Sequence, residues 1–141
     1  MKTLSIIIPC FNEAANVAPM VARLEATLAG VPWEAIFVDD DSPDGTTAAV
    51  RAIAAADSRI RCLRRIGRRG LASACIEGML ATSAPYLAVI DGDLQHDETL
   101  LPRMLEALET GHADIVIGSR NIEGGDKQGG LTAARQLISD T

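Results

Sequence analysis

Five short apolar runs alternate along this chain with segments in which apolar residues recur at helical spacing. The runs cover residues 4–8, 35–38, 60–63, 86–90 and 115–117. Apolar runs of this length are typical of parallel strands that are buried on both faces of a sheet. Consecutive parallel strands are joined by right-handed crossover helices. The alternation therefore predicts an α/β fold, with a Rossmann-like, mostly parallel sheet and helices on both of its faces.

Four helices are expected between these strands. The first should begin near Asn16, a residue type that caps helix N-termini, with Pro19 in its first turn, and should end at Gly30. The second should follow the turn at residues 42–45, the third should span about 71–82, and the fourth should end at Gly111. Ligands of such sheets bind beyond the carboxyl ends of the strands. The polar segments that follow the strands are therefore the candidate site.

Charge and composition exclude several classes of protein. The 141-residue chain has a net charge of −6, and a nucleic-acid partner would require a basic face. Six arginines do cluster locally, and they could either contact phosphates or form a solvated surface. These are Arg59, Arg61, Arg64, Arg65, Arg68 and Arg69. Three cysteines without metal-binding spacing indicate a reducing, cytoplasmic environment, and the sequence contains no signal-peptide pattern or apolar run long enough to span a membrane.

The sharpest candidate site is Asp91-Gly92-Asp93, which directly follows the fourth apolar run. Alternate side chains of extended backbone share a face, so the two carboxylates can converge on one cation, while Gly92 allows a ligand to approach the backbone. Two carboxylates bind Mg²⁺ or Mn²⁺ weakly and leave the other coordination positions to substrate phosphates. Gln95 could add an oxygen ligand. The alternative is a polar turn that caps the next helix.

Two further candidate segments follow the first and second apolar runs. After the second run, four carboxylates within six residues repel one another unless cations or N–H donors offset the charge. We assign to Asp40 the recognition of N–H donors on a nucleobase, whereas Ser42 or Asp44 is expected to cap the next helix. After the first run, Phe11 could stack on a base or pack in the core. Glu13 could contact the base or ribose, or act as an acid favoured by the helix dipole.

In their order along the chain, these motifs resemble those of family 2 glycosyltransferases of the GT-A fold. The matching segments are residues 5–13, 38–46, 70–78, 91–95 and 114–120. Within that family, the chain most resembles dolichyl- or polyprenyl-phosphate mannose and glucose synthases, and the resemblance extends to about Gly125. It departs from the family at Phe11, where such enzymes often have tyrosine. It also departs at Arg68-Arg69, where they often have Lys-Leu.

The resemblance implies a role for each matching position. The residues that would line the nucleoside pocket are Pro9, Phe11, Glu13, Val38 and Asp40. The residues that would bind metal and diphosphate are Asp91, Gly92 and Asp93, with Gln95 also on the metal. Arg120 would contact the phosphates or the sugar of the donor. Asp93 and Arg120 would be catalytic, because the metal and the arginine stabilise charge on the departing diphosphate.

The same resemblance implies an enzyme, namely an inverting transferase that depends on Mg²⁺ or Mn²⁺. It would move a hexose from a nucleoside diphosphate sugar, of the GDP-mannose or UDP-glucose type, to polyprenyl or dolichyl phosphate. One alternative is a family 2 transferase that acts on a saccharide or protein hydroxyl. The others are a nucleotidyltransferase, a receiver-like signalling domain and a nucleotide-binding module without activity. The acidic loop after the first run argues against a nucleotidyltransferase, and Arg120, where a receiver would have lysine, argues against a receiver. The sequence contains no G-x-G-x-x-G after the first run, which disfavours a dinucleotide oxidoreductase.

The chain is expected to divide into two regions. Residues 1–125 should form the nucleotide-sugar-binding GT-A domain. Residues 126–141 should form a glycine-rich loop and the start of a truncated acceptor-side segment, so that this fragment alone would be inactive. The expected partners are the nucleotide sugar and a polyprenyl phosphate at a membrane surface, without nucleic acid and with a homo-oligomer left open. The expected location is the cytoplasm or, for a full-length protein, the cytoplasmic face of the membrane.

Overall fold

Four parallel strands form one sheet in the order β3-β2-β1-β4. The computed structural model describes residues 2–118. The strands of its sheet are β1 (Leu4–Cys10), β2 (Trp33–Asp39), β3 (Ile60–Arg64) and β4 (Tyr86–Val89). β1 lies between β2 and β4, with Leu4 opposite both Trp33 and Tyr86. The first four predicted strands are therefore confirmed, and their carboxyl ends meet at one edge of the sheet.

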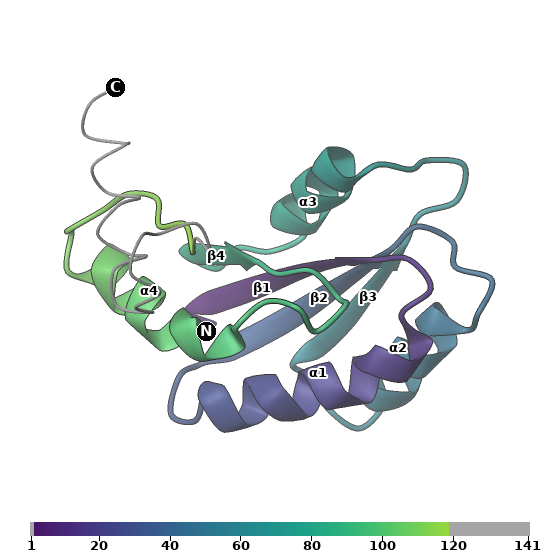
Figure 1. Ribbon diagram of the computed structural model, residues 1–141, viewed down its shortest axis with the longest axis horizontal. Helices are drawn as coiled ribbons and strands as arrows, with labels where there is room; N and C mark the ends of the chain where they lie inside the picture. The colour runs from purple at the N-terminus through teal and green to yellow at the C-terminus, as the bar shows by residue number, and fades with distance from the viewer. Residues whose placement is uncertain (1, 119–141) are drawn as a thin grey trace. The chain divides into compact units, whose positions relative to one another are not determined.

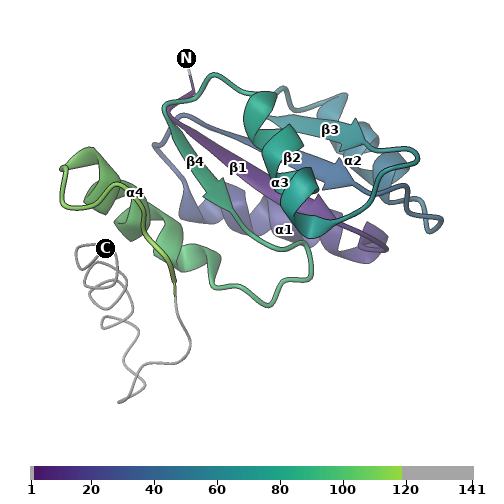
Figure 2. The same cartoon turned by 90° about the horizontal axis from the view of Figure 1, so that it is seen from above.

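Helices cover both faces of this sheet, as the sequence predicts. α1 (Ala14–Thr27) and α2 (Thr46–Ala54) lie on one face, and α3 (Leu71–Leu80) lies on the other (Figure 1). Figure 2 shows α3 crossing over the strands from above. The chain divides into two compact units after Glu98. The 3-10 helix η1 (Glu98–Leu100) lies at this division, and α4 (Leu101–Glu109) belongs to the second unit.

In the core beneath α3, small residues of the helix pack closely against the sheet. Ile7, Ile36 and Val38 of the two central strands form a buried cluster with Ala74 of α3. Gly78 of the same helix lies so close to the sheet that a Cβ atom there would be 2.4 Å from Cγ2 of Ile7. Helix α3 can therefore approach the strands at this distance only because residue 78 has no side chain.

The first helix begins earlier than the sequence predicts. Its first residue is Ala14, and Asn16, the expected N-cap, lies inside its first turn. The backbone N–H of Glu13 donates to Oγ1 of Thr46 at 3.1 Å, and that of Ala14 donates to a carboxylate oxygen of Asp44 at 3.1 Å. Side chains some 30 residues away thus bind the N–H groups that a helix leaves unpaired at its start. No local pattern could reveal such partners.

The fifth predicted strand is wrong for the part of the chain that the structure describes. Residues 115–117 form no strand, and both Ile115 and Ile117 are exposed. A strand needs a neighbour to pair its backbone groups, and an apolar run specifies the strand without specifying that neighbour. In the same unit, α4 begins at Leu101, buries Leu101 and Leu105, and ends two residues before Gly111, close to the predicted end.

Among residues 2–118, every helix is too short or too polar to cross a membrane. The predicted location of the protein therefore remains a prediction.

Candidate functional site

The loops that follow β1, β2 and β4 meet at the carboxyl edge of the sheet. The backbone N–H of Asp40 donates to the carbonyl of Cys10 at 3.2 Å. On the other side of β1, Gly92 is buried, and a Cβ atom there would lie 3.1 Å from Cβ of Cys10 and 3.5 Å from Cγ of Glu13. The structure therefore brings together the predicted nucleoside segments and the predicted metal segment, which are far apart in the sequence.

Each of these three loops contains one non-glycine residue with a left-handed backbone. The residues are Asn12 after β1 (φ 56°), Asp41 after β2 (φ 60°) and Leu94 after β4 (φ 63°). This conformation is uncommon for side chains other than asparagine and aspartate, and it costs energy for leucine. Such strain persists where surrounding contacts fix the backbone, and it concentrates at ligand sites.

Side chains of the β2–α2 loop bind the start of α1. Oγ of Ser42 accepts the N–H of Asn12 at 2.8 Å, and Asp44 accepts the N–H of Ala14 through Oδ2. Oδ1 of Asp44 accepts the N–H of Thr46, the first residue of α2, at 3.0 Å, but the N-cap residue of α2 is Gly45 and not Ser42 or Asp44 as predicted. The hydroxyl of Thr46 also donates to this carboxylate, and these bonds hold the pKa of Asp44 below its usual value.

The predicted nucleoside residues fall into an exposed set and a buried set. Phe11 is 43% exposed, so it is not a core residue. Glu13 is half-buried, and its carboxylate accepts the side-chain amide of Asn16 at 2.5 Å. Pro9 is buried in β1, and Val38 is fully buried in the cluster beneath α3. In this structure the side chain of Val38 therefore offers no surface to a nucleotide.

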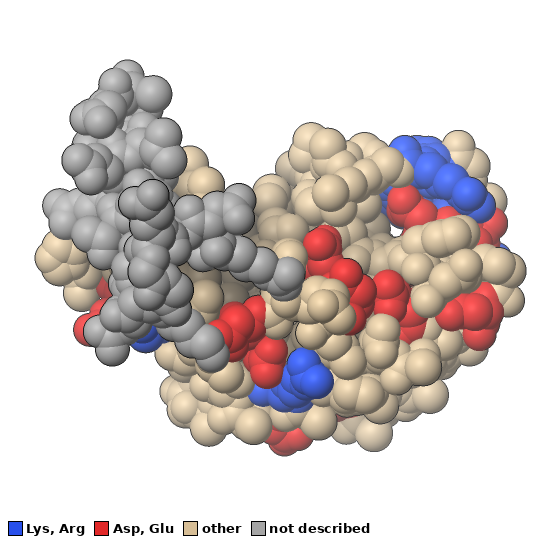
Figure 3. Space-filling model, viewed as in Figure 1, with Lys and Arg blue, Asp and Glu red and all other residues tan. Residues whose placement is uncertain are grey.

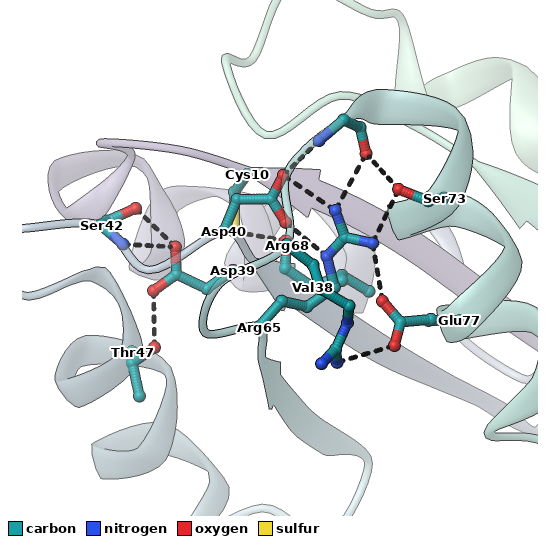
Figure 4. A network of polar contacts seen from close by, with 11 residues as sticks. Cys10, Val38, Asp39, Asp40, Ser42, Thr47, Arg65, Arg68, Ser73 and Glu77 are labelled. Carbon is teal, nitrogen blue, oxygen red and sulfur yellow. Dashed lines mark hydrogen bonds and ion pairs between the residues drawn. The ribbon is translucent and has the colours of Figure 1, made fainter.

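Asp40 is bound by a residue that the sequence reasoning placed only in a basic cluster. Nε of Arg65 donates to Oδ1 of Asp40 at 2.7 Å, and Nη2 of Arg65 donates to Oδ2 at 3.2 Å. The backbone N–H of Gly70 donates to the same Oδ2 at 3.1 Å. The side chain of Arg65 is only 1% exposed, so this is a buried, bidentate pair (Figure 4). A bidentate pair of this kind fixes the relative orientation of the two side chains and also adds binding energy.

Arg65 also connects Asp40 to helix α3. Its Nη1 atom donates to Glu77 at 2.6 Å and to Oγ of Ser73 at 2.9 Å, and Nη2 donates to the carbonyl of Gly70 at 3.2 Å. Figure 4 shows the guanidinium enclosed by these acceptors. The hydrogen bonds that Arg65 donates to Asp40, followed by the one to Glu77, raise the pKa of Arg65, and Arg65 in turn lowers the pKa of Glu77.

The arginine cluster is mainly paired with acids and does not form an open phosphate-binding face. The carboxylate partners are Asp57 and Glu25 for Arg59, Glu34 for Arg61, Asp41 for Arg64, Asp40 and Glu77 for Arg65, and Glu77 for Arg68. Arg69 differs, because its guanidinium lies over the ring of Phe11, 4.9 Å from the ring centroid.

The predicted metal residues lie in one short loop after β4. Asp93 is exposed, and its Oδ1 atom accepts the N–H of Gln95 at 3.0 Å. Asp91 is half-exposed, with Oδ2 3.3 Å from Nε2 of His96, whose Nδ1 accepts the Asp91 N–H at 3.2 Å. Within residues 2–118, three or more His, Cys, Asp or Glu side chains are nowhere grouped as a metal site. Arg120, the other predicted catalytic residue, lies outside the described residues.

Acidic side chains gather in a band across the face of the molecule shown in Figure 3. One group of basic side chains lies over the loop that joins β3 and α3, and another lies beside the acidic band. An anionic ligand that bound along this band would be repelled unless a cation accompanied it.

Sequence reasoning missed three features of this site. They are the buried role of Arg65, the contact between Arg69 and Phe11, and the contact between His96 and Asp91. The available signal for Arg65 was its position two residues after a predicted strand, at the same edge as Asp40. The signal for His96 was its place in the loop that holds Asp91 and Asp93.

A solved structure with the same architecture defines the fold class. A glucosyl-3-phosphoglycerate synthase from Mycobacterium tuberculosis, in complex with Mn²⁺, UDP and glucosyl-3-phosphoglycerate, matches with a TM-score of 0.62 and 26% identity. The match covers 78% of this chain and 40% of that one. The fold is therefore that of the GT-A glycosyltransferases, as predicted.

The profile of glycosyl transferase family 2 matches residues 5–135, and the chain belongs to this family. It is 38% identical, over 136 residues, to a dolichol-phosphate mannosyltransferase from Pyrococcus furiosus. It is also 38% identical, over 143 residues, to an undecaprenyl-phosphate mannosyltransferase from Micrococcus luteus. These matches cover 96% and 99% of this chain but only 38% and 56% of the two relatives.

Proposed function

We propose that this chain is the donor-binding part of a metal-dependent, inverting glycosyltransferase. The donor is a nucleoside diphosphate hexose of the GDP-mannose or UDP-glucose type, and the acceptor is a polyprenyl phosphate. The observation that carries the proposal is the convergence of Glu13, Asp40 and Gly92 at one edge of the sheet. The relatives named as dolichol- and undecaprenyl-phosphate mannosyltransferases support the class of acceptor.

The loop after β4 has the donor set of a divalent-cation site. Asp91, Asp93 and the side-chain amide of Gln95 provide only oxygen ligands, which Mg²⁺ and Mn²⁺ prefer. Gly92 packs tightly against β1, where an added Cβ atom would lie 3.1 Å from Cβ of Cys10, so the loop backbone lies close to the strand. Two carboxylates are an incomplete set, and the diphosphate oxygens of the donor would supply further ligands. A bound cation would neutralise the diphosphate as it leaves.

The nucleoside would bind on the other side of β1, near Phe11 and Asp40. Phe11 presents an exposed ring on which a base or ribose can stack. Asp40 lies beside it at the end of β2 and can accept an N–H group of the base. Glu13, at the start of α1, is within reach of either loop. Pro9 and Val38 would support this pocket from beneath, because both are buried.

The acceptor chemistry fits a site without a dedicated proton-abstracting base. A phosphate monoester has a second pKa of about 6, so its attacking oxygen is largely ionised at neutral pH. The chain then has to orient the donor and stabilise charge on the leaving diphosphate. We assign part of that stabilisation to Arg120. A polyprenyl acceptor would place the reaction at a membrane surface, on its cytoplasmic face.

The metal assignment makes the first prediction. Calorimetric titration with GDP-mannose, UDP-glucose and UDP-N-acetylglucosamine should show binding of one donor in Mn²⁺ and weaker binding in chelator. Asp93→Asn should reduce this difference by at least roughly 10-fold, because the variant loses one carboxylate ligand of the cation. Thermal unfolding should change little, because Asp93 is exposed.

Asp97→Asn provides a matched control, because Asp97 is an exposed carboxylate of the same loop to which we assign no metal contact. The control should keep the wild-type dependence on metal. Equal affinity of the wild-type chain in Mn²⁺ and in chelator would contradict the metal assignment. Binding of none of the three donors would contradict the proposed function.

A further inference from the structure

The loop that joins β3 to α3, residues 65–70, is fixed at both ends by Asp40. At its start, the Arg65 guanidinium forms the bidentate pair with this carboxylate. At its end, the Gly70 N–H donates to the same group. Figure 4 shows the pair between Arg65 and Asp40. Because β2 and β3 are neighbouring strands, this β3–α3 loop is held beside the predicted nucleoside pocket in a defined position.

The two exposed arginines of the β3–α3 loop have different partners. Nη2 of Arg68 donates to Glu77 at 2.8 Å, so its charge is balanced by an acid. The Arg69 guanidinium lies 4.9 Å from the centroid of the Phe11 ring, within the range in which a cation is attracted to an aromatic face. Within residues 2–118, no carboxylate forms a salt bridge with Arg69. Its positive charge therefore remains at the pocket, held by the ring of Phe11.

We infer that Phe11 and Arg69 form one stacking surface for the base of the nucleotide donor, and that Arg69 is a nucleoside-binding residue. The inference rests on the proposed function. A guanidinium is planar and delocalised, and bases stack on guanidinium groups as well as on aromatic rings. Phe11 lacks the hydroxyl of a tyrosine, and the N–H donors of Arg69 supply polar contacts at the same place.

The sheet topology distinguishes a base contact from a phosphate contact. In the order β3-β2-β1-β4, the β3–α3 loop that carries Arg69 and the loop that carries Asp91 and Asp93 lie on opposite sides of the central pair of strands. The Asp91–Asp93 loop approaches β1 through Gly92, whereas Arg69 approaches Phe11 from the β3 side. A donor with its diphosphate at the β4 side therefore has its base at the β3 side, where Arg69 lies.

Calorimetric titration with GDP and UDP in Mn²⁺ tests this inference with three variants. Arg69→Ala should weaken the binding of the preferred diphosphate roughly 10-fold, as expected for loss of a stacking partner. Arg69→Lys should weaken binding by a similar factor, because lysine keeps the positive charge but lacks the planar guanidinium group. Arg68→Ala is the matched control, since it removes a neighbouring exposed arginine that is bound to Glu77, and it should bind as the wild-type chain does.

The outcomes separate the inference from the function on which it rests. If the wild-type chain binds neither diphosphate, the proposed function fails and the inference fails with it. If the wild-type chain binds and Arg69→Ala binds equally well, only the inference is wrong. Full affinity in Arg69→Lys with loss in Arg69→Ala would identify a charge contact to phosphate and would also overturn base stacking. Because Arg69 is exposed, the Arg69 variants should melt at the same temperature as the wild-type chain. Equal melting temperatures would exclude unfolding as the cause of weaker binding.

Discussion

The carboxylate of Asp40 has four lone-pair positions, two on each oxygen. Arg65 and Gly70 occupy three of them, because Oδ1 accepts one N–H donor and Oδ2 accepts two. One position on Oδ1 remains for an N–H group of a base. The structure thus gives Asp40 a structural task beside the recognition task we propose, and a simple substitution would disturb both.

Two variants separate these tasks. Asp40→Ala should lower the free energy of unfolding by about 2–4 kcal/mol, because it leaves the buried guanidinium of Arg65 without its bidentate partner. Adding Arg65→Met to Asp40→Ala should restore much of this loss by removing the buried charge, as urea denaturation would measure. If Asp40 also reads the base, the double variant should still lose about 1–3 kcal/mol of selectivity between GDP and UDP. Wild-type selectivity in the double variant would leave Asp40 with the structural task alone.

For single residues, the sequence predicts contacts between residues that are close together along the chain. It misses contacts between residues that only the fold brings together. Asp91 and Asp93 are two residues apart in one loop, so their proximity follows from the sequence. The pair formed by Asp40 and Arg65 spans 25 residues, and the pair formed by Phe11 and Arg69 spans a greater distance along the chain. Nothing in the local sequence distinguishes Arg65 from the other arginines of the cluster. It was therefore expected to contact phosphates or to lie on a solvated surface, as they were.

The secondary-structure elements were predicted best where an apolar pattern alone decides them. β1 to β4 and α1 to α3 all occur near their expected positions, because buried faces impose their periodicity on the sequence. The start of α1 was wrong because its caps come from Asp44 and Thr46, which no local rule reveals. The strand predicted at residues 115–117 was wrong because a strand also needs a neighbouring strand, and these residues form no strand pairs in the described part of the chain.

Helix α3 allows a test of the close contact that positions the β3–α3 loop. Gly78→Ala adds a methyl group 2.4 Å from Cγ2 of Ile7, so helix and sheet must separate. We expect a loss of about 1–3 kcal/mol in the free energy of unfolding, measured by urea denaturation. Leu80→Ala is the matched control in the same helix, because Leu80 is 81% exposed, and it should change stability little. At a solvated helical position glycine to alanine stabilises, so a gain from Gly78→Ala would contradict the packing.

The whole chain combines a negative net charge with an acidic band at the edge where the donor is proposed to bind. A nucleoside diphosphate sugar is itself anionic, and such a surface would repel it in the absence of a cation. The charge of the molecule therefore supports the proposed requirement for Mg²⁺ or Mn²⁺, in addition to the carboxylates of Asp91 and Asp93. The basic side chains relieve little of this repulsion, because most of them are already paired with acids.

The 141 residues span only 38% and 56% of the two mannosyltransferases they match, and we propose that the site described within them binds the nucleotide. Sugar transfer also needs groups that hold the acceptor in line with the donor sugar, because orientation supplies a large part of the rate. We therefore expect this chain to bind the nucleotide sugar weakly in Mn²⁺ and to transfer no labelled sugar to polyprenyl phosphate. The full-length Micrococcus luteus protein is the positive control for transfer, measured as label extracted into organic solvent. The segment of that protein which matches this chain should bind without transferring. Robust transfer by the 141-residue chain alone would place the acceptor site within these residues. That result would contradict the expectation that this chain binds the donor without transferring the sugar.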